Sequence, residues 1–175
     1  SKRKKKWLKL SNQIISKNHS TKIILLYLSI IGIIGFTLRI IYFPFDIPLA
    51  FDSLEYFFYA MDITTIGKLP LNYTPINNGW PIFLSGFFSL FSFENSISYM
   101  ELQRMLSIII STFTFIPIYY LCRKFVNSSF SIVGAAIFVF EPRIIQNSLL
   151  GISDPLYIFL SACSLALIFD SRGKL

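Results

Sequence analysis

The sequence predicts an all-α integral membrane protein with about four transmembrane helices and further interfacial helices in a long first outer loop. Three observations predict this class: 54% of the 175 residues are hydrophobic, only 14% are charged, and long apolar runs recur along the chain. In an average soluble domain about a quarter of the residues are charged. The composition therefore excludes intrinsic disorder and an ordinary cytosolic enzyme.

The positive charge is concentrated at the N-terminus. Eight of the sixteen basic residues and none of the nine acidic residues lie at positions 1–22. Basic segments that flank a span prefer the cytoplasmic side, where they also attract anionic lipids. We therefore interpret residues 1–22 as a basic cytoplasmic tail that contacts membrane lipids. A nucleic-acid partner is not expected, because the tail is attached directly to a span.

Residues 23–43 form the first predicted transmembrane helix. At a rise of about 1.5 Å per residue this run reaches the roughly 30 Å thickness of a hydrocarbon core. A cleaved signal peptide is the alternative, but the apolar run is too long and no small-residue cleavage site follows it. Arg39 lies one turn from the far end, and it either extends outward to the interface or points into a protein interior.

Three shorter apolar segments predict the remaining spans. The predicted elements are the first outer loop with juxtamembrane helices at 44–101, transmembrane helix 2 at 102–122, an inner loop at 123–129, transmembrane helix 3 at 130–140, a second outer loop at 141–154, transmembrane helix 4 at 155–169, and a cytoplasmic end at 170–175. Because the chain begins with Ser and stops just after an apolar run, we expect a fragment of a longer protein.

The apolar segment at 80–93 decides the topology. It has only about fourteen residues, which favours an interfacial or re-entrant helix over a span. If it does not cross, Arg123 and Lys124 return to the cytoplasm, as basic residues prefer. The prediction is a multi-pass protein of the cell membrane with its N-terminus in the cytoplasm and both predicted outer loops outside.

The outer loops hold most of the acidic residues, and two of these stand out. Asp52 follows a proline-rich exit from the first span, and Asp154 precedes the fourth span on the same side of the membrane. Each can be an ordinary solvated charge, and Asp52 can be the N-cap of the helix-like stretch after it. If Asp52 is partly desolvated among Phe51, Phe57 and Phe58, it is instead suited to accept a proton.

Several segments carry a family resemblance. They are Leu-Arg at 38–39, Phe-Asp-Ser-Leu-Glu-Tyr at 51–56, Gly-Lys-Leu-Pro at 67–70, Gly-Trp-Pro at 79–81, Glu-Leu-Gln-Arg at 101–104, Glu-Pro-Arg at 141–143 and Ser-Asp-Pro-Leu-Tyr at 153–157. Together they resemble the N-terminal third of polytopic GT-C glycosyltransferases, such as the protein O-mannosyltransferase-like and aminoarabinose-transferase-like enzymes. One departure is that Ser53 stands where the family pattern has a second acid.

The resemblance implies a membrane enzyme that transfers a hexosyl or pentosyl group from a polyprenyl-phosphate donor to a protein, lipid or glycan acceptor outside the cytoplasm. Asp52 would be the base of an inverting reaction. The residues expected to bind substrate are Glu55, Tyr56, Arg104, Arg143 and Asp154, with the arginines on the donor phosphate. No cofactor or metal is expected. The more distant oligosaccharyltransferase catalytic subunit holds a divalent metal with acids from both outer loops, so Mg or Mn bound by Asp52 and Asp154 is the alternative.

Aromatic residues of the outer loop offer stacking faces for a sugar, with an ordinary interfacial aromatic belt as the alternative. These residues are Tyr56, Tyr59, Tyr73 and Trp80. Two other classes of function stay open: a transporter or flippase fragment, and a non-catalytic multi-pass membrane subunit. The absence of acids within the predicted spans argues against the transporter, whereas Ser53 argues for the non-catalytic subunit.

Overall fold

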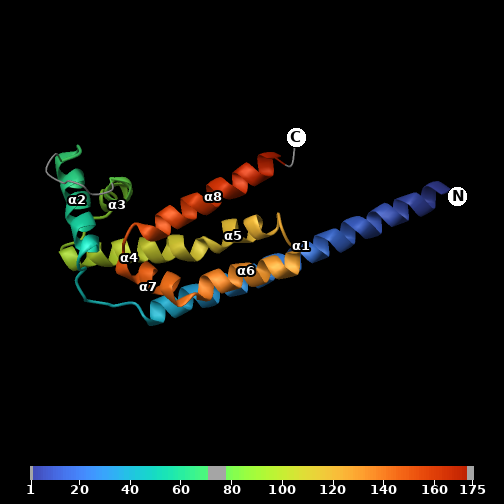
Figure 1. Cartoon of the computed structure of the whole chain (residues 1–175), viewed down its shortest axis with the longest axis horizontal. Helices are drawn as coiled ribbons and strands as arrows, with labels where there is room; N and C mark the ends of the chain where they lie inside the picture. The colour runs from blue at the N-terminus through green and yellow to red at the C-terminus, as the bar shows by residue number, and fades with distance from the viewer. Residues whose placement is uncertain (1, 71–77, 173–175) are drawn as a thin grey trace.

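The computed structural model describes the backbone of residues 2–70 and 78–172 and the side chains of residues 21–70 and 78–170. Within these ranges it contains eight helices and no strand, which confirms the predicted all-α class (Figure 1). The helices are α1 (Lys2–Ile41), α2 (Asp52–Ile66), α3 (Gly79–Phe88), α4 (Ser96–Phe113), α5 (Phe115–Cys122), α6 (Ser128–Phe140), α7 (Pro142–Leu150) and α8 (Asp154–Arg172).

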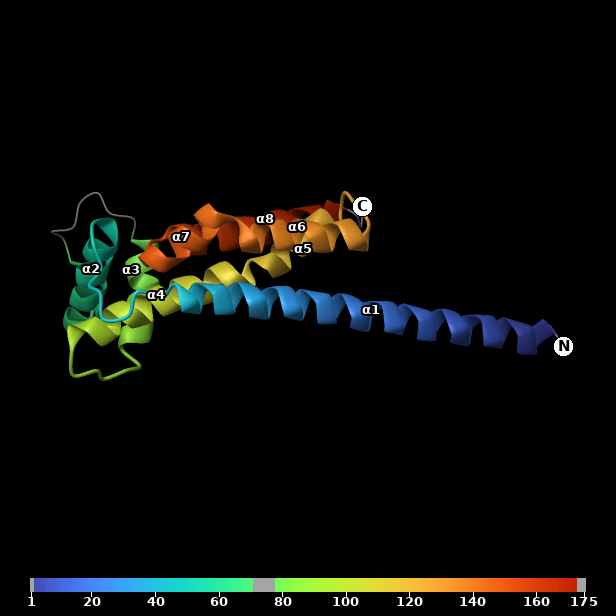
Figure 2. The ribbon, with the colours of Figure 1, turned by 90° about the horizontal axis from the view of Figure 1, so that it is seen from below.

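The molecule has a long bundle and a compact cap. The bundle consists of α1, α4, α5, α6, α7 and α8, and its long helices run side by side (Figure 1). The cap consists of α2 and α3, which lie together at one end of the bundle, beside the start of α4 (Figure 2). The N-terminal part of α1 extends beyond the opposite end, so the basic tail and the cap are at opposite ends of the molecule.

Two helical segments are long and apolar enough to cross a membrane. They are Thr21–Ile41 in α1 and Ser96–Cys122, which combines α4 and α5. The pair α6 and α7 is bent by 49° and provides a third candidate if the two helices form one span. Among the described residues α8 is not a further candidate, so the structure supports two or three spans, and the predicted four are not confirmed.

The first two predicted spans have different boundaries in the structure. The basic tail does not end where the span begins, because α1 is one continuous helix of 40 residues from Lys2. The second span begins at Ser96 instead of residue 102, because the Asn95 side chain caps α4 by accepting the backbone N–H of Ser98 at 2.8 Å. Pro117 lacks a backbone N–H, and the break between α4 and α5 at Thr114 lies one turn before it.

The segment between the third and fourth predicted spans is helical, which corrects the prediction of a loop at 141–154. Pro142 is the first residue of α7, a position where its missing N–H costs nothing. Gly151 ends α7 in the left-handed conformation at φ 73°, and α8 begins three residues later. A helix therefore replaces most of the expected loop and leaves only a tight turn before Asp154.

The predicted interfacial or re-entrant helix at 80–93 is shorter than expected. The structure has α3 at Gly79–Phe88, and its 10 residues span roughly 15 Å, about half of a hydrocarbon core. Its burial is also informative, because α3 packs against α2 through Trp80, Leu84 and Phe88, all of them 1% exposed or less. This helix is thus part of the cap core.

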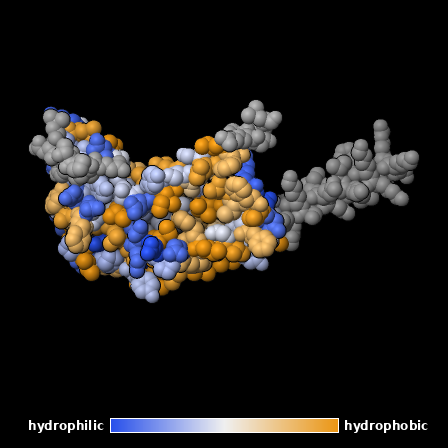
Figure 3. Space-filling model, in the orientation of Figure 1, coloured by the Kyte–Doolittle hydropathy of each residue, from blue (hydrophilic) through white to orange (hydrophobic). Residues whose placement is uncertain are grey.

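Two separate hydrophobic clusters hold the molecule together. The cap cluster joins α2, α3 and the first half of α4, and its buried members are Leu49, Phe57, Ala60, Trp80, Leu84, Phe88, Met100 and Leu106. The bundle cluster joins α1, α5 and α6 through Leu28, Phe115, Tyr119, Ala135 and Val139. Apolar residues also cover much of the bundle's outer surface, with more hydrophilic residues over the cap end (Figure 3), as expected for helices that face lipid.

Candidate functional site

Asp52 is the first residue of α2, at the end of the bundle that carries the cap. A carboxylate in the first helical turn is favourable because the N-terminus of a helix carries partial positive charge. The N-cap position is held by Phe51, with φ 53° and no side-chain cap bond, so the alternative in which Asp52 is the N-cap does not hold.

The surroundings of Asp52 are more open than the sequence suggested. Its side chain is exposed, as is that of Glu55 one turn later. Phe51 is 90% exposed and Phe58 is 51% exposed, so neither encloses the carboxylate. The expected partial desolvation of Asp52 is therefore absent from this structure, and the carboxylate is accessible to solvent.

Asp154 occupies the equivalent position in α8. It is the first residue of that helix, and its Oδ2 accepts the Asn147 side-chain amide at 3.2 Å. Its side chain is exposed. The two acids singled out by the sequence are thus both located in first helical turns.

A direct contact places the starts of α2 and α8 next to each other. The Ser153 hydroxyl, beside Asp154, donates to the Tyr56 hydroxyl at 3.4 Å. Tyr56 lies one turn after Asp52 and is half-buried. The expected substrate residue Tyr56 thus contacts the chain next to the second acid, and it joins two segments that are far apart in the sequence.

Beneath this surface, the carbonyl of Gly151 accepts two buried donors. Trp80 Nε1 donates to it at 3.0 Å and Gln103 Nε2 at 2.8 Å. Gln103 Nε2 also donates to the carbonyl of Ser53 at 2.9 Å. We call Trp80, Gln103 and Gly151, with the Ser53 carbonyl, the Gly151 junction. It connects α2, α3, α4 and the turn between α7 and α8.

The Gly151 junction changes the interpretation of the outer aromatics. Trp80 is 1% exposed and Tyr59 is 2% exposed, so both belong to the protein core and neither offers a free face to a sugar. The Tyr59 hydroxyl instead donates to Asn78 Oδ1 at 2.9 Å. Tyr73 lies outside the described residues. Tyr56 is the remaining candidate of the four.

Arg104 has an internal role in this structure, which corrects its assignment to the donor phosphate. It is 5% exposed, and its guanidinium donates to the carbonyls of Pro44, Ile47 and Pro48. These carbonyls belong to the irregular segment between α1 and α2, where two prolines prevent helical hydrogen bonding. Arg104 therefore holds this segment against α4, and its Nε is buried without a partner.

Arg143 differs from Arg104 in being available. It lies in the first turn of α7, its side chain is exposed, and within the described part of the chain no hydrogen bond or ion pair engages it. It is eight residues before Gly151, or roughly 12 Å along a helix, and no contact joins it to Asp52 or Asp154. Of the two expected phosphate ligands, Arg143 is the one with a free guanidinium.

A metal site is not assembled by the described residues. Among them no group of three or more His, Cys, Asp or Glu side chains is arranged to hold an ion. Asp52 and Asp154 supply two carboxylates, whereas hard divalent cations take six or more oxygen ligands, part of them water. The alternative in which these acids hold Mg or Mn gains no support from this geometry.

Sequence reasoning left two outcomes open for Arg39, and the structure selects the interior. Arg39 is fully buried, and its Nε donates to Ser148 Oγ at 3.1 Å, Nη1 to the Gly35 carbonyl at 2.9 Å and Nη2 to Ser111 Oγ at 3.3 Å. These acceptors lie on α7, α1 and α4, so one guanidinium connects three helices. Within the described residues no carboxylate neutralises its charge.

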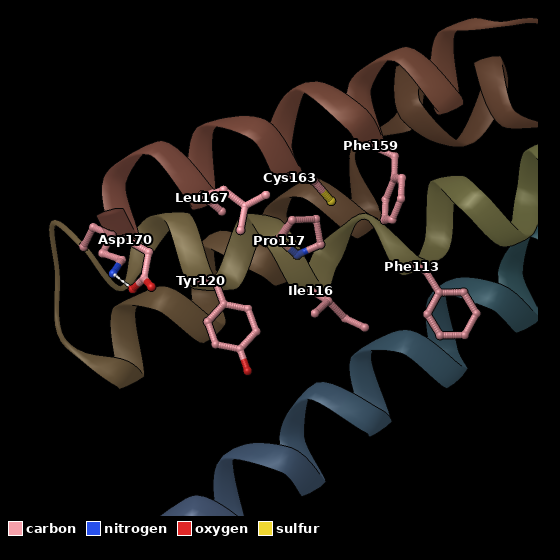
Figure 4. Close-up of a pocket in the computed structure, with 10 residues that line it drawn as sticks. Phe113, Ile116, Pro117, Tyr120, Phe159, Cys163, Leu167 and Asp170 are labelled. Atoms are coloured by element: carbon pink, nitrogen blue, oxygen red, sulfur yellow. Dashed lines mark hydrogen bonds and ion pairs between the residues drawn. The ribbon is translucent and has the colours of Figure 1, made fainter. Parts of the chain in front are cut away.

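Two apolar grooves flank α5 on the surface of the bundle. The first measures about 610 Å³ and lies between α5 and α8. Phe159 and Leu167 of α8 point toward α5, where Pro117 lies between them (Figure 4). It ends at Lys124, whose Nζ is 2.7 Å from Asp170. The second measures about 680 Å³ and lies between α1 and the α4–α5 segment. Each is mainly apolar and lies within the size range of small-molecule sites.

Sequence reasoning missed Gln103 and Gly151. Gln103 lies inside a segment that the family resemblance covers, but a neutral amide among apolar residues carries no sequence signal that distinguishes it from other polar residues of a helix. Gly151 carried a readable signal, since a glycine directly after an apolar helical segment is typical of a helix end. Comparison of the chain with protein-family models, with curated proteins and with solved structures found no match in any of the three.

Proposed function

We propose that this chain is the N-terminal part of a membrane glycosyltransferase of the GT-C type. The sugar passes from a polyprenyl-phosphate donor to a protein, lipid or glycan acceptor on the extracytoplasmic side. The observation that carries the proposal is the juxtaposition of two exposed helix-start acids, Asp52 and Asp154, through the contact between Tyr56 and Ser153. The resemblance in the sequence supplies the reaction class.

Asp52 acts as the base in this proposal. Its carboxylate takes the proton of the acceptor hydroxyl while that oxygen forms a bond to the anomeric carbon of the donor sugar. The bond from the anomeric carbon to the phosphate oxygen breaks, and polyprenyl phosphate leaves with inversion. Arg143, an exposed cation next to Pro142 in the first turn of α7, is the candidate ligand for the phosphate charge.

The lipid part of the donor is accommodated by the apolar bundle surface. Both grooves beside α5 are lined mainly by carbon, as a prenyl chain requires. The orientation with the N-terminus in the cytoplasm rests on the basic tail and belongs to the proposal. In this orientation the cap end, with Asp52 and Asp154, is outside.

One observation favours a non-catalytic membrane subunit as the second candidate. Ser53, which replaces the second acid of the family pattern, is 3% exposed, and its hydroxyl donates to the Ala50 carbonyl at 2.6 Å. It therefore supplies no group to a ligand. If Glu55 does not take over this role, a two-carboxylate mechanism is not available.

Mutation of Asp52 to Asn in the full-length membrane protein tests the proposal. The Asn side chain keeps the shape but cannot accept the proton, so transfer of a labelled sugar should fall about 100- to 10,000-fold. Glu94→Gln is the matched control, because Glu94 is also an exposed acid at the cap end. Unchanged transfer in Asp52→Asn would refute the role of Asp52 as the base, whereas no transfer by the purified unmutated protein would favour the non-catalytic subunit.

A further inference from the structure

A buried glutamine joins the starts of the two helices that carry the proposed site. Gln103 is fully buried in α4, and its Nε2 donates to the carbonyls of Ser53 at 2.9 Å and Gly151 at 2.8 Å. Ser53 follows Asp52 directly, and Gly151 lies three residues before Asp154. A single amide group therefore connects two segments that are remote in the sequence.

Both hydrogen bonds of the Gln103 side chain need its NH2 group as the donor. Both neighbouring groups are carbonyl oxygens, which can only accept, and the Gln103 Oε1 atom is buried without a partner. A reversed amide would place Oε1 against two acceptors, so its orientation is determined by the contacts. Gln103 therefore makes two hydrogen bonds through Nε2, while its Oε1 has no partner among the described residues.

The Gly151 side of this connection is closely packed. Gly151 has φ 73°, and a Cβ at this position would lie 3.3 Å from Arg104 Cγ and 3.4 Å from Gln103 Cγ. Trp80 Nε1 is a second donor to the same carbonyl. The turn before α8 therefore cannot slide along α4 without losing two buried hydrogen bonds and meeting side chains.

We infer that Gln103 is a positioning residue that fixes the start of α2 relative to the start of α8, and so Asp52 relative to Asp154. Its consequence for sugar transfer rests on the proposed function, whereas its effect on the two helix starts does not. Gln103 is not a catalytic residue, because it is fully buried and the protein's own carbonyls occupy its amide donors.

The distance between the two helix starts is the direct test. Phe58 on α2 and Tyr157 on α8 are 51% and 72% exposed, so both accept nitroxide labels without entering the core. The labels are attached to Phe58→Cys and Tyr157→Cys in the full-length protein in nanodiscs, after every native cysteine, Cys122 and Cys163 included, is replaced by Ala. Double electron–electron resonance then gives the distance distribution, with both acids retained.

Gln103→Met removes both donors at similar volume, and we expect the single narrow distance peak to be lost in favour of a broad or shifted distribution. Gln103→Asn keeps the donors on a side chain one methylene shorter, which reaches at most one of the two carbonyls, so it should broaden the peak less. If the Met variant is not recovered folded, the Asn variant decides. Trp80→Phe leaves the link to Ser53 intact and should have the smallest effect of the three.

Ser107→Ala is the matched control. Ser107 lies one turn further along α4, is fully buried, and its hydroxyl has no partner, so its removal should leave the distances unchanged. Unchanged distances in both Gln103 variants would overturn the inference, whatever the transfer activity. Broadened distances together with full activity of Asp52→Asn would instead refute the proposed function and leave the positioning role of Gln103 supported.

Discussion

The cap and the bundle are held together by different interactions. Where the cap meets the bundle, side chains of α4 donate to backbone carbonyls of segments far along the chain, as Gln103 does to Ser53 and Gly151 and as Arg104 does to the segment between α1 and α2. In the bundle, helices approach closely at small residues, for example where Gly35 lies against Val139 and Gly134 against Cys122. Few polar groups take part there, and Arg39 is the main exception.

The difference follows from the two environments. Helices in lipid satisfy their own backbone groups, so neighbouring helices gain mainly by close contact, which small residues permit. The cap contains irregular segments with free carbonyls, and these need side-chain donors when they are buried. Substitutions that change side-chain volume should therefore destabilise the bundle most. Near the cap, substitutions that remove a hydrogen-bond donor or a glycine with positive φ should have the larger effect.

The largest effect is expected at Gly35, where α1 meets α6. A Cβ at this position would overlap Val139 Cγ1, so Gly35→Ala should destabilise the protein by about 3 kcal/mol, the upper part of the usual range for overpacking. The free energy of unfolding in detergent measures it. Gly35→Ala combined with Val139→Ala removes the overlapping methyl groups and should recover much of the loss. Gly86→Ala is the control, because open space surrounds Gly86.

A second comparison separates backbone strain from packing within the cap end. Gly67 and Gly151 have nearly the same backbone, with φ 72° and 73°, but open space surrounds Gly67 whereas three side chains lie within 3.4 Å of a Cβ at Gly151. Both substitutions to Ala incur about 1 kcal/mol for the left-handed conformation. Gly151→Ala should cost about 1 kcal/mol more, because its neighbours must move. Equal losses of unfolding free energy would contradict the proposed tightness of the Gly151 junction.

Apolar runs in the sequence predicted most of the helices. The helix boundaries and the number of spans were predicted less well, mainly where an apolar run is short. The first span followed directly from its hydrophobic run, but the continuation of α1 through the tail was not predicted, although no Gly or Pro interrupts residues 2–31. The helix α7 was not predicted because its nine residues, Pro142–Leu150, are too short and too mixed to show a clear apolar run. The number of spans depended on segments near the minimum length, which the sequence alone does not resolve.

For the candidate site, the sequence predicted where the acidic residues lie better than it predicted which side chains are buried and what they contact. Asp52 and Asp154 were expected on the same side, and both lie in first helical turns joined by the contact between Tyr56 and Ser153. Whether a basic residue points outward or inward was not predictable, because it depends on partners remote in the sequence. Arg104 and Arg143 illustrate this, since the first is buried on carbonyls of residues 44–48 and the second is exposed.

Substitutions of Arg39 test whether this buried residue stabilises the bundle through its hydrogen bonds or through its positive charge. Arg39→Lys keeps the positive charge, but an ammonium group cannot reach Ser148, Ser111 and the Gly35 carbonyl in one planar fork. Arg39→Met removes both the hydrogen bonds and the buried charge. We expect Lys to lower the unfolding free energy by about 2 kcal/mol and Met to lower it less, since removing a buried charge recovers its desolvation cost. The reverse order would mean that the positive charge itself stabilises the bundle.

The smallest effect is expected at the ion pair between Lys124 and Asp170, which closes the groove between α5 and α8 at the end opposite the cap. Its atoms are 2.7 Å apart, but the side chains are 33% and 56% exposed, so water and salt screen the attraction. Lys124→Ala and Asp170→Ala should each change the unfolding free energy by less than about 1 kcal/mol, and the coupling energy from the double variant should fall as salt rises. A coupling well above this, unaffected by salt, would mean that the pair is shielded from water. In that case a polar contact would contribute to the bundle as strongly as the hydrogen bonds contribute to the cap.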